Sequence, residues 1–85
     1  MPQISRFFGI IISMFYKDHN PPHFHAEYGD DEVLIKIEDL NYRGHLPGRA
    51  LGLVIEWASE HQQELMVNWE NARQEQLLTK IEPLK

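Results

Sequence analysis

The sequence predicts a small α+β domain in which an antiparallel sheet of three to four strands packs against a long C-terminal helix. This helix could be continuous or kinked, or it could be divided into a helix pair. Three observations predict this class. The first half of the 85-residue chain holds runs of β-branched and aromatic residues separated by turn residues. From Pro47 onward, apolar residues recur at spacings of three and four. No linker or repeat divides the chain, so we expect residues 1–85 to form one domain, strand-rich over 4–45 and helical over 47–74.

The strands are predicted from composition and alternation. Residues 9–17 are rich in β-branched and aromatic side chains, which is typical of a central strand buried on much of both faces. The segment 20–22, Asn-Pro-Pro, ends it because two prolines remove two backbone donors. Residues 23–28 and 32–38 read as the next two strands, and 39–45 as a tight connection with a short fourth strand.

The helical half begins at Pro47, a residue suited to the first helical position. The apolar stripe comprises Leu51, Val54, Ala58, His61, Leu65, Trp69 and Ala72. One helix over 47–73 would be about 40 Å long, more than the expected width of the domain. We therefore expect either a kink near 59–61 or a protruding helix that pairs with another chain. Residues 78–82 could add an edge strand.

Composition and charge limit the classes of function. The formal net charge is −5 and the basic residues are scattered, so we do not expect direct binding of nucleic acid. A nuclease using His19 or His23 with Arg6 or Arg43 would meet the same electrostatic obstacle. The chain has no cysteine, which fits a reducing, cytoplasmic location and excludes Cys-based zinc sites. The apolar stretch 7–16 is too short to span a bilayer, so no membrane association is expected.

The most unusual feature is a histidine-rich turn and strand, Asp18-His19-Asn20-Pro21-Pro22-His23-Phe24-His25. Alternation along a strand places His23, His25 and Glu27 on one face. The opposite, core-facing set is Phe24, Ala26 and Tyr28. The histidines and the carboxylate are therefore expected to lie together, away from the core.

Two imidazoles and a carboxylate are ligands that suit a divalent transition metal such as zinc, iron or nickel. The candidate metal ligands are His19, His23, His25 and Glu27, with Asp18 as a further possibility across the turn. This pattern favours a metal-binding protein or a metal-dependent hydrolase. The alternative is that these side chains are simply polar strand residues, turn-stabilising groups or partner contacts.

A second hypothesis concerns a protein interface. A domain this small has a modest core, so association would add burial, and we expect a homo-oligomer or a small protein partner. Trp57, Leu65 and Trp69 on the helical stripe are the candidate anchors, or else core residues.

Several strings together resemble one bacterial family, the domain of unknown function 4160. They include the segment 18–29, whose run His-Asn-Pro-Pro-His-Phe-His-Ala is specific to the family, and the segments 1–10, 46–51, 56–58, 68–70 and 80–84. The resemblance covers essentially the whole chain.

The resemblance implies little about activity, because the family has no established one. Members are commonly encoded beside another small domain of unknown function (number 2442), and such pairs are suspected to be toxin–antitoxin-like modules. A small protein partner is therefore implied. The family's histidine string corresponds here to His19, His23 and His25, without a catalytic role attached. The sequence thus favours a non-enzymatic interaction module, with the metal site as the alternative.

Overall fold

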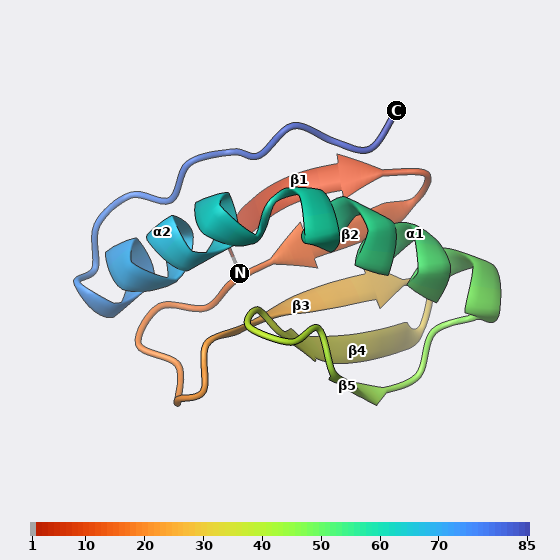
Figure 1. Ribbon diagram of the computed structural model, residues 1–85, viewed down its shortest axis with the longest axis horizontal. Coiled ribbons are helices and arrows are strands. Elements are labelled where there is room, and N and C mark those ends of the chain that lie inside the picture. The colour runs from red at the N-terminus through yellow and green to blue at the C-terminus, as the bar shows by residue number, and fades with distance from the viewer. Residues whose placement is uncertain (1) are drawn as a thin grey trace.

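The computed structural model describes residues 2–85 and shows a five-stranded antiparallel sheet followed by two helices (Figure 1). Sequence neighbours are also neighbours in the sheet, in the order β1-β2-β3-β4-β5. The strands are β1 (Gln3–Phe7), β2 (Ile10–Ser13), β3 (His23–Tyr28), β4 (Asp31–Lys36) and β5 (Tyr42–Gly44). The α+β class and the antiparallel sheet are confirmed, whereas the expected three to four strands are too few.

The additional strand comes from a tight turn at Phe8 and Gly9. Both residues have positive φ angles, 50° and 80°, as a two-residue type I′ hairpin turn requires. Phe7 pairs with Ile10 across this turn, so β1 and β2 form a hairpin. The turn lies inside an apolar run and has Phe where Asn is usual, which is why the sequence pattern did not reveal it.

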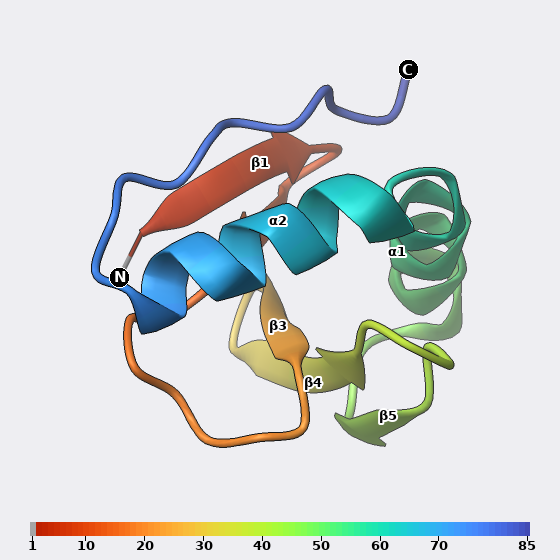
Figure 2. The same cartoon turned by 60° about the vertical axis from the view of Figure 1, so that its left-hand side comes forward.

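The helical half consists of α1 (Gly48–Glu60) and α2 (Gln62–Arg73). The chain leaves helical geometry at His61, with φ −130° and ψ 23°. A single continuous helix is therefore wrong, and the expected break near 59–61 is confirmed. The longest dimension of the domain is 33 Å, which is shorter than an uninterrupted helix of about 40 Å. Figure 2 shows α1 almost end-on while α2 crosses the view, so the chain turns sharply between them.

The core lies between one face of the sheet and the two helices. Trp57 of α1 packs against Phe7 of β1 and Phe24 of β3, with ring centroids 5.5 and 5.9 Å apart. Trp57, Leu65 and Trp69 are each at most 1% exposed. The three candidate interface anchors thus lie in the core of a single chain, where they offer no surface to a partner.

The C-terminal segment after α2 runs alongside β1 (Figures 1 and 2). The Ile81 N–H donates to the Ile4 carbonyl at 2.8 Å, and Ser5 Oγ donates back to the Ile81 carbonyl at 3.0 Å. The possible edge strand over 78–82 is not formed, because these two bonds do not extend into a ladder. The segment nevertheless covers an edge that would otherwise be open to pairing. Within residues 2–85, neither helix has the length and apolar character needed to cross a bilayer.

Candidate metal centre

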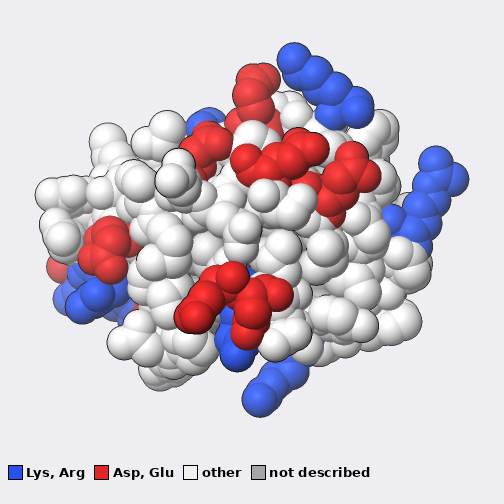
Figure 3. Space-filling view, viewed as in Figure 1, with Lys and Arg blue, Asp and Glu red and all other residues white. Residues whose placement is uncertain are grey.

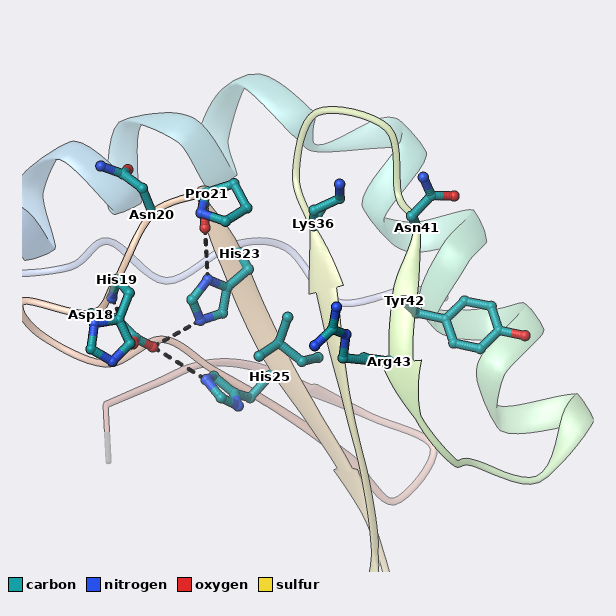
Figure 4. A pocket seen from close by; sticks show the side chains of 11 residues that line it. Asp18, His19, Asn20, Pro21, His23, His25, Lys36, Asn41, Tyr42 and Arg43 are labelled. Carbon is teal, nitrogen blue, oxygen red and sulfur yellow. Dashed lines mark hydrogen bonds and ion pairs between the residues drawn. The ribbon is translucent and has the colours of Figure 1, made fainter.

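The histidine cluster forms where the long connection from β2 enters β3. The connection passes through Asp18 and the two prolines before β3 begins at His23. Phe24 and Ala26 of β3 are fully buried, as the alternation predicts. His23 and His25 point the other way, toward Asp18 on the loop (Figure 4). The strand therefore presents two imidazoles to one carboxylate that arrives from outside the sheet.

The three side chains meet at one point. Asp18 Oδ2 lies 2.8 Å from His23 Nε2 and 3.5 Å from His25 Nε2. One potential ligand atom from each residue lies within 4.8 Å of the others. Their side chains are 18%, 7% and 13% exposed for Asp18, His23 and His25, so the cluster is largely shielded yet reachable.

The outer nitrogen of each ring is held by a hydrogen-bond acceptor. His23 Nδ1 lies 2.8 Å from the Pro21 carbonyl oxygen, and His25 Nδ1 lies 3.0 Å from Glu32 Oε2. A carbonyl and an ionised carboxylate can only accept, so both Nδ1 atoms must carry the proton and donate. Both Nε2 atoms face Asp18: a protonated Nε2 donates to this carboxylate, and a neutral one offers its lone pair to a metal ion. Metal-binding histidines are commonly held in this way, by a carbonyl or carboxylate behind the ring.

Aromatic packing holds the two rings in place. Phe15 meets the ring of His25 edge-on at 4.4 Å, and Trp69 of α2 packs against His23 at 5.2 Å. The two imidazoles are themselves 5.3 Å apart. Because packing and the outer hydrogen bonds both restrict the rings, the geometry of the cluster is established by the fold.

Asp18 remains an anion in this environment. Its burial works to raise the pKa of the carboxyl group, but the hydrogen bond from the His19 backbone N–H opposes this effect. Interactions with His25 and His23 act in the same direction, and the net pKa of Asp18 is lowered. A carboxylate kept ionised is the form that can bind a cation.

The structure distributes the predicted ligands unevenly. It brings His23, His25 and Asp18 together. His19 is exposed, and among residues 2–85 only its backbone N–H bonds to the cluster. Glu27 lies further along β3, opposite Ile11 and Glu32, and is not part of the group. Asp18 therefore supplies the carboxylate that the sequence pattern had assigned first to Glu27.

Glu32 also contacts the cluster, and the sequence pattern did not predict this. It lies at the start of β4, directly opposite Glu27, and reaches diagonally to His25. The signal was present in the hairpin: a two-residue turn at 29–30 pairs Tyr28 with Asp31 and so places Glu32 across from Glu27. Without that register, Glu32 reads as a solvated turn residue.

Two buried polar groups border the cluster without a hydrogen-bond partner in residues 2–85. They are the Ser13 hydroxyl and the Trp69 indole N–H. Ser13 is the cross-strand neighbour of His25, and the Trp69 ring contacts His23. Leaving a buried polar group unpaired costs about 1–3 kcal/mol.

The cluster forms one wall of a pocket of about 620 Å³. Lys36, Asn41 and Arg43 contribute to its other side. On the face of the molecule seen in Figure 3, by contrast, acidic side chains gather near the centre and Lys and Arg stand mainly at the rim. That face is unsuited to a nucleic-acid backbone.

The fold and this site together define a small α+β protein with a carboxylate and two histidines converging in a pocket. A comparison with protein families matches the model described as "Domain of unknown function (DUF4160)" to residues 9–70. The match covers more than half of the chain and all of the cluster, and the chain belongs to this family. Searches of curated proteins and of solved structures gave no match.

Proposed function

We propose that this protein binds a divalent transition metal ion through Asp18, His23 and His25. The observation that carries the proposal is the convergence of one ligand atom from each of these three side chains, within 4.8 Å of one another. Both rings bond outward through Nδ1, so the two Nε2 atoms and a carboxylate oxygen converge on one another. When both rings are neutral with their protons on Nδ1, three acceptor atoms face one another, and a metal ion among them would satisfy all three.

The donor set suits particular ions. Two imidazole nitrogens and one carboxylate oxygen are ligands for zinc, iron(II) or nickel, and three protein ligands leave coordination positions open. An ion bound in this way would supply Lewis-acid polarisation and a bound water of lowered pKa. A metal-dependent hydrolase is the activity that this arrangement would allow, because the open side of the cluster faces the pocket.

A proton is the competing cation. If one Nε2 is protonated, the same distances describe a histidine–aspartate ion pair, and the cluster is then a structural element. The two explanations differ in what they predict above neutral pH. The metal hypothesis requires tight, saturable binding of one ion, and the ion-pair hypothesis requires none.

The test uses protein purified without a histidine tag. Elemental analysis and titration calorimetry with Zn²⁺ at pH 7.5 should give one ion per chain. Asp18→Asn and the double variant His23→Ala, His25→Ala should each abolish that binding. His45→Ala is the matched control, because His45 is exposed and lies outside the cluster. Unchanged stoichiometry in the double variant, or no binding by the wild type, would overturn the proposal.

A second candidate function is a protein-interaction module, as a homo-oligomer or as one component of a toxin–antitoxin-like pair. Trp57 and Trp69 are buried in the core, so a different surface must support this candidate. Phe8 and Tyr28 are 61% and 40% exposed and border a hollow of about 390 Å³ lined also by Pro47 and Leu53. Exposed aromatics beside an apolar hollow are typical of partner surfaces.

Phe8→Asn tests the homo-oligomeric form of this candidate. Phe8 has a φ of 50°, where Asn is favoured, so the variant removes the aromatic ring without disturbing the turn. Light scattering should show a wild-type mass above that of one chain and a monomeric variant. A wild type that stays monomeric at high concentration would contradict self-association.

A further inference from the structure

Arg43 lies across the sheet from the candidate metal centre. His25 of β3 is opposite Leu34 of β4, and Leu34 is opposite Arg43 of β5. Residues paired in this way share one face of a sheet, and two strand spacings separate the Cα atoms of His25 and Arg43 by about 10 Å. Figure 4 shows the Arg43 guanidinium directed from β5 toward the histidines. A small ligand could therefore touch both groups.

The two cations of the pocket differ in their partners. Lys36 Nζ lies 3.5 Å from Asp39 Oδ2, so its charge is already paired. Arg43 makes no ion pair and no side-chain hydrogen bond with any of residues 2–85. A guanidinium with all its donors free beside a pocket is ready to bind an oxyanion, most favourably through two parallel hydrogen bonds.

The charges around the pocket indicate which kind of anion fits. A divalent ion would be balanced by the carboxylates of Asp18 and Glu32, both of which contact the histidines. Lys36 and Asp39 balance each other. Arg43 then contributes one unbalanced positive charge, and a monoanion neutralises it. Leu34 lies on the sheet between His25 and Arg43, and its apolar side chain offers a surface for the uncharged part of an organic ligand.

We infer, resting on the proposed metal site, that this pocket binds a small monocarboxylate. One carboxylate oxygen takes an open coordination position at the ion held by Asp18, His23 and His25. The other oxygen accepts hydrogen bonds from the Arg43 guanidinium. The apolar part of the molecule lies along Leu34. Arg43 thus determines which anion is bound, while the three ligands determine whether an ion is held.

The probe is benzoate added to protein loaded with Co²⁺, whose visible absorption reports changes at the ion. Benzoate should change this spectrum in a saturable way, and benzamide, its uncharged analogue, should not. Inorganic phosphate should bind more weakly than benzoate. A benzamide response equal to that of benzoate, or tighter binding of phosphate, would overturn the carboxylate assignment.

Substitutions at Arg43 locate the second contact. Arg43→Gln should weaken benzoate binding at least about tenfold, and Arg43→Lys should recover part of that loss because it restores charge without the planar fork. Co²⁺ affinity should stay unchanged in both. Arg49→Gln, an exposed arginine at the start of α1 outside this pocket, is the matched control and should bind benzoate normally.

The metal site and the carboxylate contact can be refuted separately. If wild-type protein shows no Co²⁺ spectrum, the proposed metal site is wrong. If the Co²⁺ spectrum forms but benzoate leaves it unchanged, or if Arg43→Gln binds benzoate as the wild type does, the metal site stands and the carboxylate inference is wrong.

Discussion

Glu32 should support metal binding although it does not contact the ion. Its Oε2 atom accepts the Nδ1–H of His25 at 3.0 Å and so directs the opposite nitrogen toward Asp18. Glu32→Gln keeps the size of the side chain and removes its charge. The imidazole of His25 should then be a weaker and less well oriented ligand.

The expected loss follows from how exposed the pair is. Removing such a supporting carboxylate typically weakens metal binding by about 10- to 100-fold. The Glu32 side chain is 51% exposed, so water screens its charge, and we expect the loss of affinity to be at the lower end of this range. We expect the Zn²⁺ dissociation constant of Glu32→Gln to rise about tenfold, which corresponds to about 1.4 kcal/mol.

The assay is titration calorimetry with Zn²⁺, and Glu27→Gln is the matched control. Glu27 is the direct cross-strand partner of Glu32 and the ligand that strand alternation had favoured. It makes no hydrogen bond with either histidine among the described residues. Its substitution should change the dissociation constant less than about twofold. A larger effect of Glu27→Gln than of Glu32→Gln would refute the assignment of the carboxylates.

Three further predictions concern the scaffold around the site. Asn68→Ala removes two part-buried 2.8 Å hydrogen bonds between the buried Asn68 side chain and the Thr79 backbone. The free energy of unfolding measured in urea should fall by about 2–4 kcal/mol, and an unchanged midpoint would show that these bonds do not stabilise the fold. Gly44→Ala places a Cβ atom 2.6 Å from the Glu32 carbonyl oxygen at a φ of 108°. The free energy of unfolding, measured in the same way, should fall by about 1–3 kcal/mol. Gly48→Ala is the control, because its Cβ meets open space and should not destabilise the fold. The hydrogen bond from the Asn41 backbone N–H lowers the pKa of the Asp39 carboxyl group. The stability that the ionised Asp39 contributes is therefore complete above the pKa of the unfolded chain and is lost as the pH falls through the lower pKa of the folded protein. Asp39→Asn should differ in stability from the wild type near neutral pH and converge with it in acid, and a pH-independent difference would argue against this cause.

Much of the fold could be predicted because local signals were strong. The two prolines before His23, the alternation of β3 and the three-and-four spacing after Pro47 each specify one element. The length of a continuous helix left two alternatives, a break near 59–61 or a protruding helix, and the structure shows the break. The Phe8–Gly9 turn was missed because it lies in an apolar run that continues from Phe7 into β2, so no change of pattern marks the reversal.

The site was predictable in its histidines and less so in its carboxylates. His23 and His25 follow from the two-residue period of one strand. Asp18 and Glu32 approach from a loop and from the next strand, so their positions depend on tertiary geometry and register. The tryptophans were ambiguous for a related reason: periodicity identifies an apolar face but does not tell whether the sheet or a second chain covers it.

The central claim is that Asp18, His23 and His25 hold a metal ion, and the most direct test is thermal unfolding of tag-free protein with Zn²⁺ and with a chelator. At a free ion concentration of 100 times the dissociation constant, binding adds about 2.7 kcal/mol of stability. In a domain of this size, that corresponds to a Tm about 10–20 °C higher with Zn²⁺ than with chelator. The double variant His23→Ala, His25→Ala should show no such difference. Equal Tm values for the wild type under both conditions, or the same shift in the double variant, would contradict the claim.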